Sequence, residues 1–192
     1  DSILVLKEGL KPKERFFCLS FDDGFKNIYQ NTIEIFLKDN IPCMFFIPTS
    51  FIDNLRADSG QVFFNRKNID IEFLTWNDCK KITSEKIFDI GSHSINHKLI
   101  SKLNIDECVS ELKNSKKTIE NKLNIQCNHF APPVGDYSLK RDLKIIKDSK
   151  YKSLSTTVRG KMSNMENDVF AIKRHHLLAN WEADYLKYFF SK

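Results

Sequence analysis

The feature of this sequence that most constrains its fold is an alternation between short apolar runs and longer segments with helical periodicity. Buried strands are short and apolar, whereas a helix repeats its apolar residues every three or four positions. The runs that we predict as strands are residues 16–21, 43–47, 87–90, 125–131, 151–157 and 169–173. The helices that we predict are residues 28–37, 106–123 and 139–148.

This alternation predicts parallel strands joined by crossover helices, in an α/β barrel or an open sheet. Six visible strands are compatible with a barrel of seven or eight. We find no internal repeat, low-complexity tract or Pro/Gly-rich linker, so we expect one domain over residues 1–192. In such folds the chemistry lies at the carboxyl ends of the strands.

Composition excludes several other classes of protein. No apolar stretch approaches the roughly 20 residues that a membrane helix needs, so we expect no integral membrane segment. The net charge of +5 comes from lysines spread along the helices, which favours a solvated surface over a nucleic-acid patch. These features do not indicate an oligomeric state.

The five cysteines are odd in number and scattered, with no CxxC pair. This pattern predicts reduced core cysteines rather than a disulfide framework, and we therefore expect a cytoplasmic protein. The chain begins at Asp1 without a methionine, so an extracytoplasmic or membrane-associated location stays open as the alternative.

The stretch "FFCLSFDDGF" places two adjacent carboxylates, Asp22 and Asp23, directly after a predicted strand. One interpretation is a simple turn, because Asp and Gly favour the conformations that end strands. The other is a pair of functional carboxylates at the mouth of the sheet.

The stretch "DIGSHSINHKLI" places His93 and His97 four positions apart, again after a predicted strand. If the segment is helical, both imidazoles share one face and can reach a single metal ion. Such a spacing also arises by chance in a chain with five histidines. Its position after a strand, like that of the two aspartates, favours the metal site.

The stretch "HFAPPVGDY" follows the predicted strand 125–131 and contains two prolines and a glycine. It is either only a rigid connection or a loop that points a backbone N–H at a developing oxyanion. Prolines have no such donor, so the N–H groups of Val134 and Gly135 are the candidates.

Together, the stretches "SFDDG", "HSINH" and "APPVG" resemble the first three motifs of the polysaccharide deacetylase family, carbohydrate esterase family 4 with the NodB-homology domain. Their order and separations are similar too, over about residues 16–160. The resemblance implies a distorted (β/α) barrel of about seven parallel strands. It further implies a metal-dependent hydrolase that removes an N-acetyl group from an amino sugar of a polysaccharide or glycan precursor.

The resemblance also implies the roles of the site residues. Asp23, His93 and His97 correspond to the ligands of one divalent ion, most often zinc, and Asp22 to the general base. Adjacent side chains at a strand end diverge, so one can bind the ion while its neighbour faces the reacting water. The Val134 N–H would stabilise the oxyanion.

The sequence departs from the family in two places. Many members carry Arg at the position of Ala131, where it contacts the catalytic Asp, although a subgroup with "FAYPxG" also lacks it. The late motif that supplies the general acid is represented by "IKRHHLL", which offers His175 and His176. We favour His176, with Arg174 serving the same region; a surface basic cluster is the alternative.

We predict that a carbohydrate substrate contacts Pro133, Gly135, Tyr137 and Trp76, although Trp76 could equally pack in the core. His129 is expected to be a hydrogen-bonded strand-end histidine rather than a ligand. Phenylalanines that we expect in the core are Phe45, Phe46, Phe63 and Phe64.

Three alternatives to the N-acetyl hydrolase stay open. The same apparatus could serve as a deformylase or as an O-acetyl esterase on a small nucleotide- or lipid-linked sugar. From another class, the chain could be a non-catalytic carbohydrate-binding barrel. The missing Arg at position 131 favours that last alternative, whereas the intact Asp22, Asp23, His93 and His97 oppose it.

Overall fold

The computed structural model of the protein describes residues 17–55, 58–65, 71–162, 168–177 and 180–191, and its centre is one parallel β-sheet. The strands are β1 (Leu19–Phe21), β2 (Cys43–Ile47), β3 (Phe88–Ser92), β4 (His129–Phe130) and β5 (Ser153–Leu154). Each strand pairs in parallel with the next one along the chain, in the order β1-β2-β3-β4-β5. Such an order requires a crossover between successive strands, and these crossovers carry helices.

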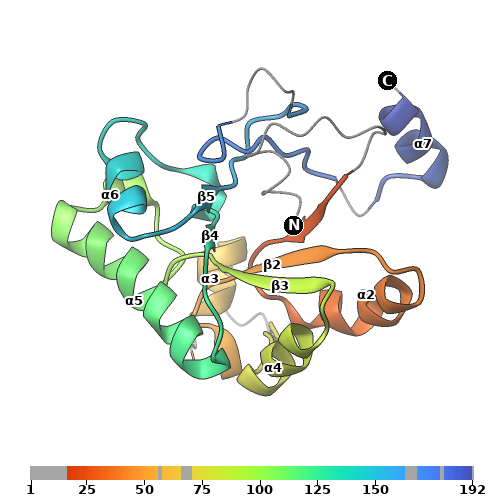
Figure 1. Ribbon diagram of the computed structural model, residues 1–192, viewed down its shortest axis with the longest axis horizontal. Helices are drawn as coiled ribbons and strands as arrows, with labels where there is room; N and C mark the ends of the chain where they lie inside the picture. The colour runs from red at the N-terminus through yellow and green to blue at the C-terminus, as the bar shows by residue number, and fades with distance from the viewer. Residues whose placement is uncertain (1–16, 56–57, 66–70, 163–167, 178–179, 192) are drawn as a thin grey trace.

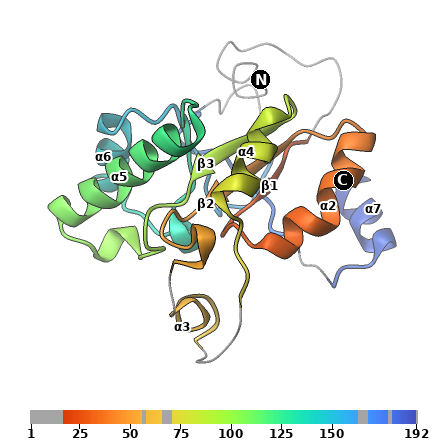
Figure 2. The same cartoon turned by 90° about the horizontal axis from the view of Figure 1, so that it is seen from below.

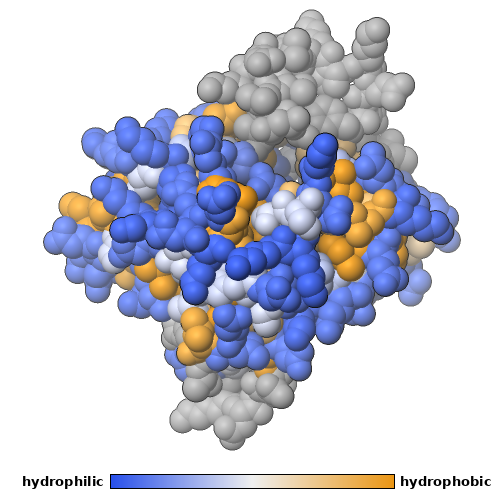
Figure 3. Space-filling model, turned by 60° about the horizontal axis from the view of Figure 1, so that its bottom comes forward, coloured by the Kyte–Doolittle hydropathy of each residue, from blue (hydrophilic) through white to orange (hydrophobic). Residues whose placement is uncertain are grey.

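The helices are α2 (Lys26–Lys38), α3 (Ser59–Phe64), α4 (Trp76–Ser84), α5 (Ile105–Leu123), α6 (Asp142–Asp148) and α7 (Ala183–Ser191). Short 3₁₀ turns are η1 (Ile52–Asn54), η2 (Ile100–Lys102) and η3 (Pro133–Gly135). Figure 1 shows α2, α4 and α5 in an arc along one side of the strands. In Figure 2, α3 projects away from the other helices. The surface seen in Figure 3 is mostly hydrophilic with separate hydrophobic patches, as amphipathic helices around a core would give.

The long helix α5 shows why these segments form helices. Asn104 caps its first turn and Glu107 returns the hydrogen bond, and α4 begins with the same arrangement. The helix ends at Asn124, which has the left-handed conformation (φ 56°) that commonly closes a helix. Its buried residues are Cys108, Glu111, Leu112, Ser115, Ile119 and Leu123. The predicted helix is confirmed, but its buried face includes Glu111, a charged residue.

The register of the sheet aligns the carboxyl ends of the strands. Ile47 of β2 pairs with Ser92 of β3, and Ser92 pairs in turn with Phe130 of β4. Phe21, the last residue of β1, pairs with Phe45. The residues that follow these strands therefore gather at one edge of the sheet, and this edge carries the candidate site.

The core lies between the sheet and the helices. Phe45 and Phe46 are 2% exposed, as expected, whereas Phe64 is 52% exposed and was wrongly expected in the core. Phe63 is half-buried, and its ring packs against the rings of Phe25, Phe51 and Phe73. Gly91 is required here because a Cβ atom would lie 2.5 Å from the Phe46 ring.

The α/β class with parallel strands and crossover helices is confirmed. Among the described residues the sheet has five strands rather than about seven. The predicted strand 151–157 is reduced to β5, and 169–173 contributes only a parallel bridge between Ser155 and Ile172. Helices α3, α4 and α7 were not predicted as such.

Two other expectations concern the cysteines and the membrane. All five cysteines are free thiols, and four are buried, as predicted; Cys18 is exposed. Within the described ranges, no helix combines the length and apolar character needed to cross a bilayer.

Candidate metal centre and active site

The turn after β1 directs the two neighbouring aspartates to different partners. Asp23 and Gly24 both have positive φ angles, 73° and 69°, which reverse the chain immediately after the strand. Gly24 also lies close to β2, since an added Cβ would be 3.3 Å from Ile47. Asp23 faces His93 and His97, whereas Asp22 faces Arg174.

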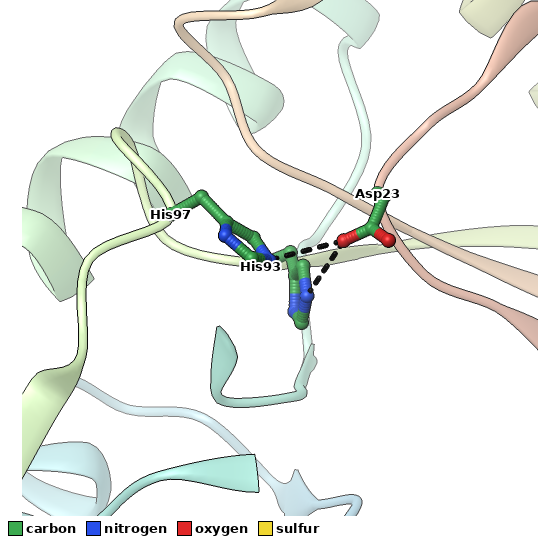
Figure 4. A group of neighbouring side chains, drawn as sticks. All are labelled: Asp23, His93 and His97. Carbon is green, nitrogen blue, oxygen red and sulfur yellow. Dashed lines mark ion pairs between the residues drawn. The ribbon is translucent and has the colours of Figure 1, made fainter. Parts of the chain in front are cut away.

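Asp23, His93 and His97 form a compact cluster (Figure 4). Asp23 Oδ1 lies 3.3 Å from His93 Nε2 and 3.1 Å from His97 Nε2. One donor atom from each residue lies within 4.8 Å of the others. His93 directly follows β3, and His97 comes from the loop after it, so β1 and β3 supply all the donors.

The surroundings of His93 fix the orientation of its ring. Its Nδ1 lies 2.7 Å from the backbone oxygen of Ala131. A carbonyl can only accept a hydrogen bond, so Nδ1 donates its proton to Ala131 and Nε2 is the ring nitrogen that faces Asp23. In metal-binding histidines, the ring nitrogen that does not bind the metal commonly donates such a hydrogen bond, which orients the ring.

The charges of the cluster depend on one another. Burial by itself would raise the pKa of Asp23, but hydrogen bonds and charges from His93 and His97 hold it far below its usual range. Burial would lower the pKa of His93, but Asp23 and Asp22 raise it instead. The two aspartates thus favour positive charge at this cluster, and the Asp23 carboxylate stays ionised.

This donor set fits a divalent metal ion. One carboxylate and two imidazoles, on side chains that are buried or half-buried, are typical of zinc sites that leave a position for water or substrate. Imidazole donors also suit other first-row transition metals. The residues present therefore match the ion that the sequence predicts, and the donors do not identify which metal it is.

Asp22 is held by Arg174 through two hydrogen bonds. Arg174 Nη1 donates to Asp22 Oδ1 at 2.7 Å, and Nη2 donates to Oδ2 at 2.8 Å. The same guanidinium donates to Ser20 Oγ at 3.1 Å and to the Thr156 carbonyl at 2.9 Å. Its central carbon lies 5.5 Å from the centre of the Phe46 ring. Asp22 thus has an arginine partner, although position 131 is an alanine. The partner, Arg174, comes from near the other end of the chain.

The position of Arg174 also connects the two edges of the sheet. Ile172 bridges to Ser155 beside β5, and the Arg174 N–H donates to the Val158 carbonyl at 3.0 Å. The Arg174 side chain reaches β1 at the opposite edge. The segment 172–174 therefore lies where further strands of a closed barrel would lie.

The third-motif loop, residues 131–137, has a backbone that only certain residues can adopt. Val134 and Gly135 have φ angles of 57° and 72°. A Cβ on Gly135 would lie 2.0 Å from Thr157 Oγ1, so this glycine is required by close approach. The Gly135 N–H donates to the Pro132 carbonyl at 2.9 Å, whereas the Val134 N–H has no acceptor among the described residues. Of the two candidate oxyanion donors, only Val134 is uncommitted within that part of the chain.

The remaining candidates lie in varied surroundings. His175 and His176 are exposed and follow Arg174 directly. Tyr137 is half-buried, and burial raises its pKa. Pro133 is buried. Trp76 is 8% exposed in the core cluster, the alternative that the sequence left open, with Lys122 Nζ 5.9 Å from its ring centre.

His129 lies away from the cluster, as predicted. It begins β4, is buried, and its Nδ1 lies 2.8 Å from Ser153 Oγ. Its Nε2 lies 3.8 Å from Asp89 Oδ2. It is a hydrogen-bonded strand-end histidine.

Two residues near the ligands were not identified from the sequence. Phe63 packs against the His97 ring, with 4.4 Å between ring centres. Glu111 of α5 binds the loop between His93 and His97. Its signal in the sequence was its spacing of three and four positions from Cys108 and Ser115, which puts a charge on the buried face of the helix.

Comparisons with known proteins bear on the family and the fold of this chain. The family model described as polysaccharide deacetylase matches residues 9–154. The Bacillus subtilis (strain 168) protein named "Putative polysaccharide deacetylase YxkH" is 25% identical over 174 residues. That match covers 91% of this chain and 56% of the other, so the chain spans about half the length of this curated relative.

Solved structures show the same fold. The Streptococcus pyogenes deacetylase PplD, in complex with acetate, has a TM-score of 0.79 at 22% identity, covering 97% of this chain and 75% of that one. A pseudoenzyme of the CE4 family from Bacillus anthracis, BA3943, has a TM-score of 0.57 at 22% identity, covering 78% and 46%. The family model spans most of the chain and includes the segments that carry Asp22, Asp23, His93 and His97. The chain therefore belongs to the polysaccharide deacetylase family.

Proposed function

We propose that this protein is a metal-dependent hydrolase that removes an N-acetyl group from an amino sugar of a polysaccharide or glycan precursor. The observation that carries the proposal is the juxtaposition of two carboxylates with different partners. Asp23 lies against two histidines, and Asp22 beside it is held by Arg174. Membership of the deacetylase family supports the reaction class.

In the proposed reaction, water adds to the acyl carbon, the C–N bond breaks, and the products are acetate and a free amine. A divalent ion, zinc in the first instance, would be held by Asp23, His93 and His97 and would polarise the acyl carbonyl and activate water. Asp22 accepts a proton from the attacking water. Arg174 holds both oxygens of Asp22, so the base does not rotate away from the reacting groups.

Two further groups complete the proposal. The Val134 N–H donates a hydrogen bond to the oxygen that becomes negative as water adds. The leaving nitrogen needs a proton because an amide nitrogen departs poorly as an anion, and His176 supplies it, with His175 as the alternative. Both histidines follow Arg174, whose side chain already contacts Asp22.

The alternatives differ in acyl group, in linkage and in activity. A deformylase or an O-acetyl esterase would use the same residues on a small nucleotide- or lipid-linked sugar. A non-catalytic carbohydrate-binding protein is the alternative from another class, and the fold includes a protein described as a pseudoenzyme. The complete Asp/His/His set and the paired Asp22 favour an active enzyme.

The test is product release by the purified chain after dialysis against zinc. Substrates are N-acetylglucosamine oligomers, their N-formyl counterparts and an O-acetylated sugar, with the Asp22→Asn variant as the matched control. We expect acetate and free amine in equal amounts from the N-acetyl substrate. Formate or ester-derived acetate alone would select one of the other hydrolases. Sugar binding without any product would select the non-catalytic alternative.

A further inference from the structure

Glu111 is a charged residue on the buried face of α5. It is 5% exposed and lies in line with Cys108, Leu112 and Ser115 on that face. Burying a carboxylate is costly unless hydrogen bonds replace the water that it loses. The partners of Glu111 therefore indicate what the residue does.

Among the described residues, the hydrogen bonds of the Glu111 side chain all go to two consecutive residues, Ile95 and Asn96. Its Oε2 accepts from the Ile95 N–H at 2.8 Å and from the Asn96 N–H at 2.9 Å. Its Oε1 accepts from Asn96 Nδ2 at 2.7 Å. Ile95 and Asn96 lie between the two candidate metal ligands, His93 and His97.

The same loop is held from its other side by the segment after β2. Thr49 N–H donates to the Ser94 carbonyl at 3.2 Å, and Ser50 N–H donates to the Ile95 carbonyl at 3.0 Å. Ser115, one turn after Glu111, donates to the Ser94 carbonyl at 2.9 Å. Glu111 thus binds two N–H groups of the loop, while Thr49, Ser50 and Ser115 bind its carbonyl groups.

The loop needs this support because its backbone is strained. Ser94 and His97 have φ angles of 67° and 54°, in the left-handed region that residues other than glycine rarely adopt. Such conformations persist only where the surroundings enforce them. His93, in contrast, directly follows the paired strand β3. His97 is the ligand whose position depends on the loop.

We propose that Glu111 is the positioning residue of the metal centre: it holds residues 94–97 so that His97 Nε2 lies beside Asp23 and His93. This inference rests on the proposed function, which requires a metal at these three residues. Within the described residues, the hydrogen bonds of the Glu111 carboxylate go to Ile95 and Asn96 and not to the ligand atoms, so Glu111 acts through the loop.

The test is the affinity of the metal-free chain, residues 1–192, for zinc, measured by competition with a chromophoric chelator. Asn96→Asp places a second carboxylate against Glu111, and we expect it to weaken zinc binding by about 10- to 100-fold. Glu111→Gln alone should weaken it less, since Asn96 can turn its amide to meet the new side chain. The double variant, Glu111→Gln with Asn96→Asp, restores a donor–acceptor pair between the two side chains and should recover most of the zinc affinity.

Glu107→Gln is the matched control on the same helix. Glu107 is exposed, and in the part of the chain that the structure describes its carboxylate accepts only from the Asn104 N–H, at 3.0 Å. Its loss should lower thermal stability and leave zinc affinity unchanged. A second measurement is amide hydrogen exchange of Ile95 and Asn96 in the metal-free chain, which should be faster in Glu111→Gln than in Glu107→Gln.

The outcomes separate the two proposals. If the wild-type chain binds no zinc, the proposed metal centre fails, and the exchange rates still decide whether Glu111 holds the loop. If the wild-type chain binds zinc, and Asn96→Asp and Glu111→Gln bind it as tightly as the wild type does, the positioning role of Glu111 is wrong. Unchanged amide exchange in Glu111→Gln would also overturn it.

Discussion

Two sides of the candidate site meet at the same edge of the sheet but are supported differently. The ligand side, residues 22–23 and 93–97, follows β1 and β3, which flank β2 in the sheet. The closing side, residues 131–137 and 172–176, depends on separate contacts of backbone and side chains, such as the Ile172 bridge, Arg174 with Asp22, and Gly135 against Thr157.

This difference indicates how each side contributes. Paired strands fix Asp23 and His93 directly after β1 and β3, whereas His97 also depends on the loop that Glu111 binds, so most of the proposed ion-binding geometry is built into the sheet. The closing side can vary as long as some group supports Asp22 and some donor reaches the substrate. Changes on the ligand side should therefore abolish activity, whereas changes on the closing side should reduce it by degrees.

The largest effect is expected at the ligand histidines. His97→Ala or His93→Ala removes one of the three donors, so the metal and the activity should be lost together. Metal content after dialysis and acetate release measure the two quantities. His129→Gln, a change at a buried histidine outside the cluster, should keep both. Stoichiometric metal in a variant without His93 and His97 would sink this assignment.

The second effect separates the two aspartates. Asp22→Asn keeps the size of the side chain but cannot accept a proton, so kcat should fall by about 10²- to 10⁴-fold while the metal stays bound. Asp23→Asn should lose metal. If both variants lost metal equally, the roles of base and ligand would have to be reassigned.

Dense local patterns made the ligand side predictable from the sequence. The apolar run 43–47 coincides with β2, and the residues after two predicted strands lie together because parallel strands end at one edge. The direction of the Asp22 side chain was not predictable, because its partner Arg174 is 152 positions away. Ala131 signalled a missing arginine without indicating its replacement.

The closing side was predicted less well for a physical reason. Residues 169–173 carry a strand-like pattern, yet only Ile172 forms a bridge, because pattern reports burial rather than pairing. The role of Glu111 was also hidden. Its contacts depend on how α5 packs on the loop after β3, which helical periodicity alone does not specify.

The third effect tests the closing side through the leaving group. His176→Ala should reduce kcat on an N-acetyl sugar by about 10²-fold, since the departing nitrogen is no longer protonated. An activated aryl acetate should be much less affected because its leaving group needs no proton. His175→Ala is the neighbouring control. Full activity of both variants on the amide would assign the proton to a water or a carboxyl group.

The fourth effect concerns Arg174. Arg174→Ala should lower kcat by about 10- to 100-fold with metal retained, because Asp22 loses the group that orients it. Added guanidinium should restore part of the rate, and Arg174→Lys should be intermediate, since lysine cannot bind both oxygens in the same way. Arg159→Ala, at an exposed position, is the control. Unchanged kcat would show that Asp22 needs no partner.

The smallest effect is on stability and concerns His129 of β4, which lies outside the ligand cluster. Burial lowers the pKa of His129, with Lys152 and Lys116 adding to the effect and Asp89 opposing it. The folded state therefore binds fewer protons than the unfolded state, in which the pKa of histidine is about 6.5. The contribution of His129 is present above that pH and is lost as the pH falls from there through the lower pKa of the folded state.

The measurement is the free energy of unfolding by denaturant at several pH values from about 7.5 to 5.5 for wild type and His129→Gln. Wild type should lose its advantage over the variant as the pH falls.

Asp89 changes stability with pH in the opposite sense, because burial raises its pKa. Wild type and His129→Gln are therefore also compared after Asp89→Asn has been introduced into both. There the difference should grow, because Asp89 no longer favours the charged imidazole. The four site and late-motif histidines are common to all four proteins, so their titration cancels. A difference that stays constant with pH would mean that His129 titrates alike in the folded and unfolded chain.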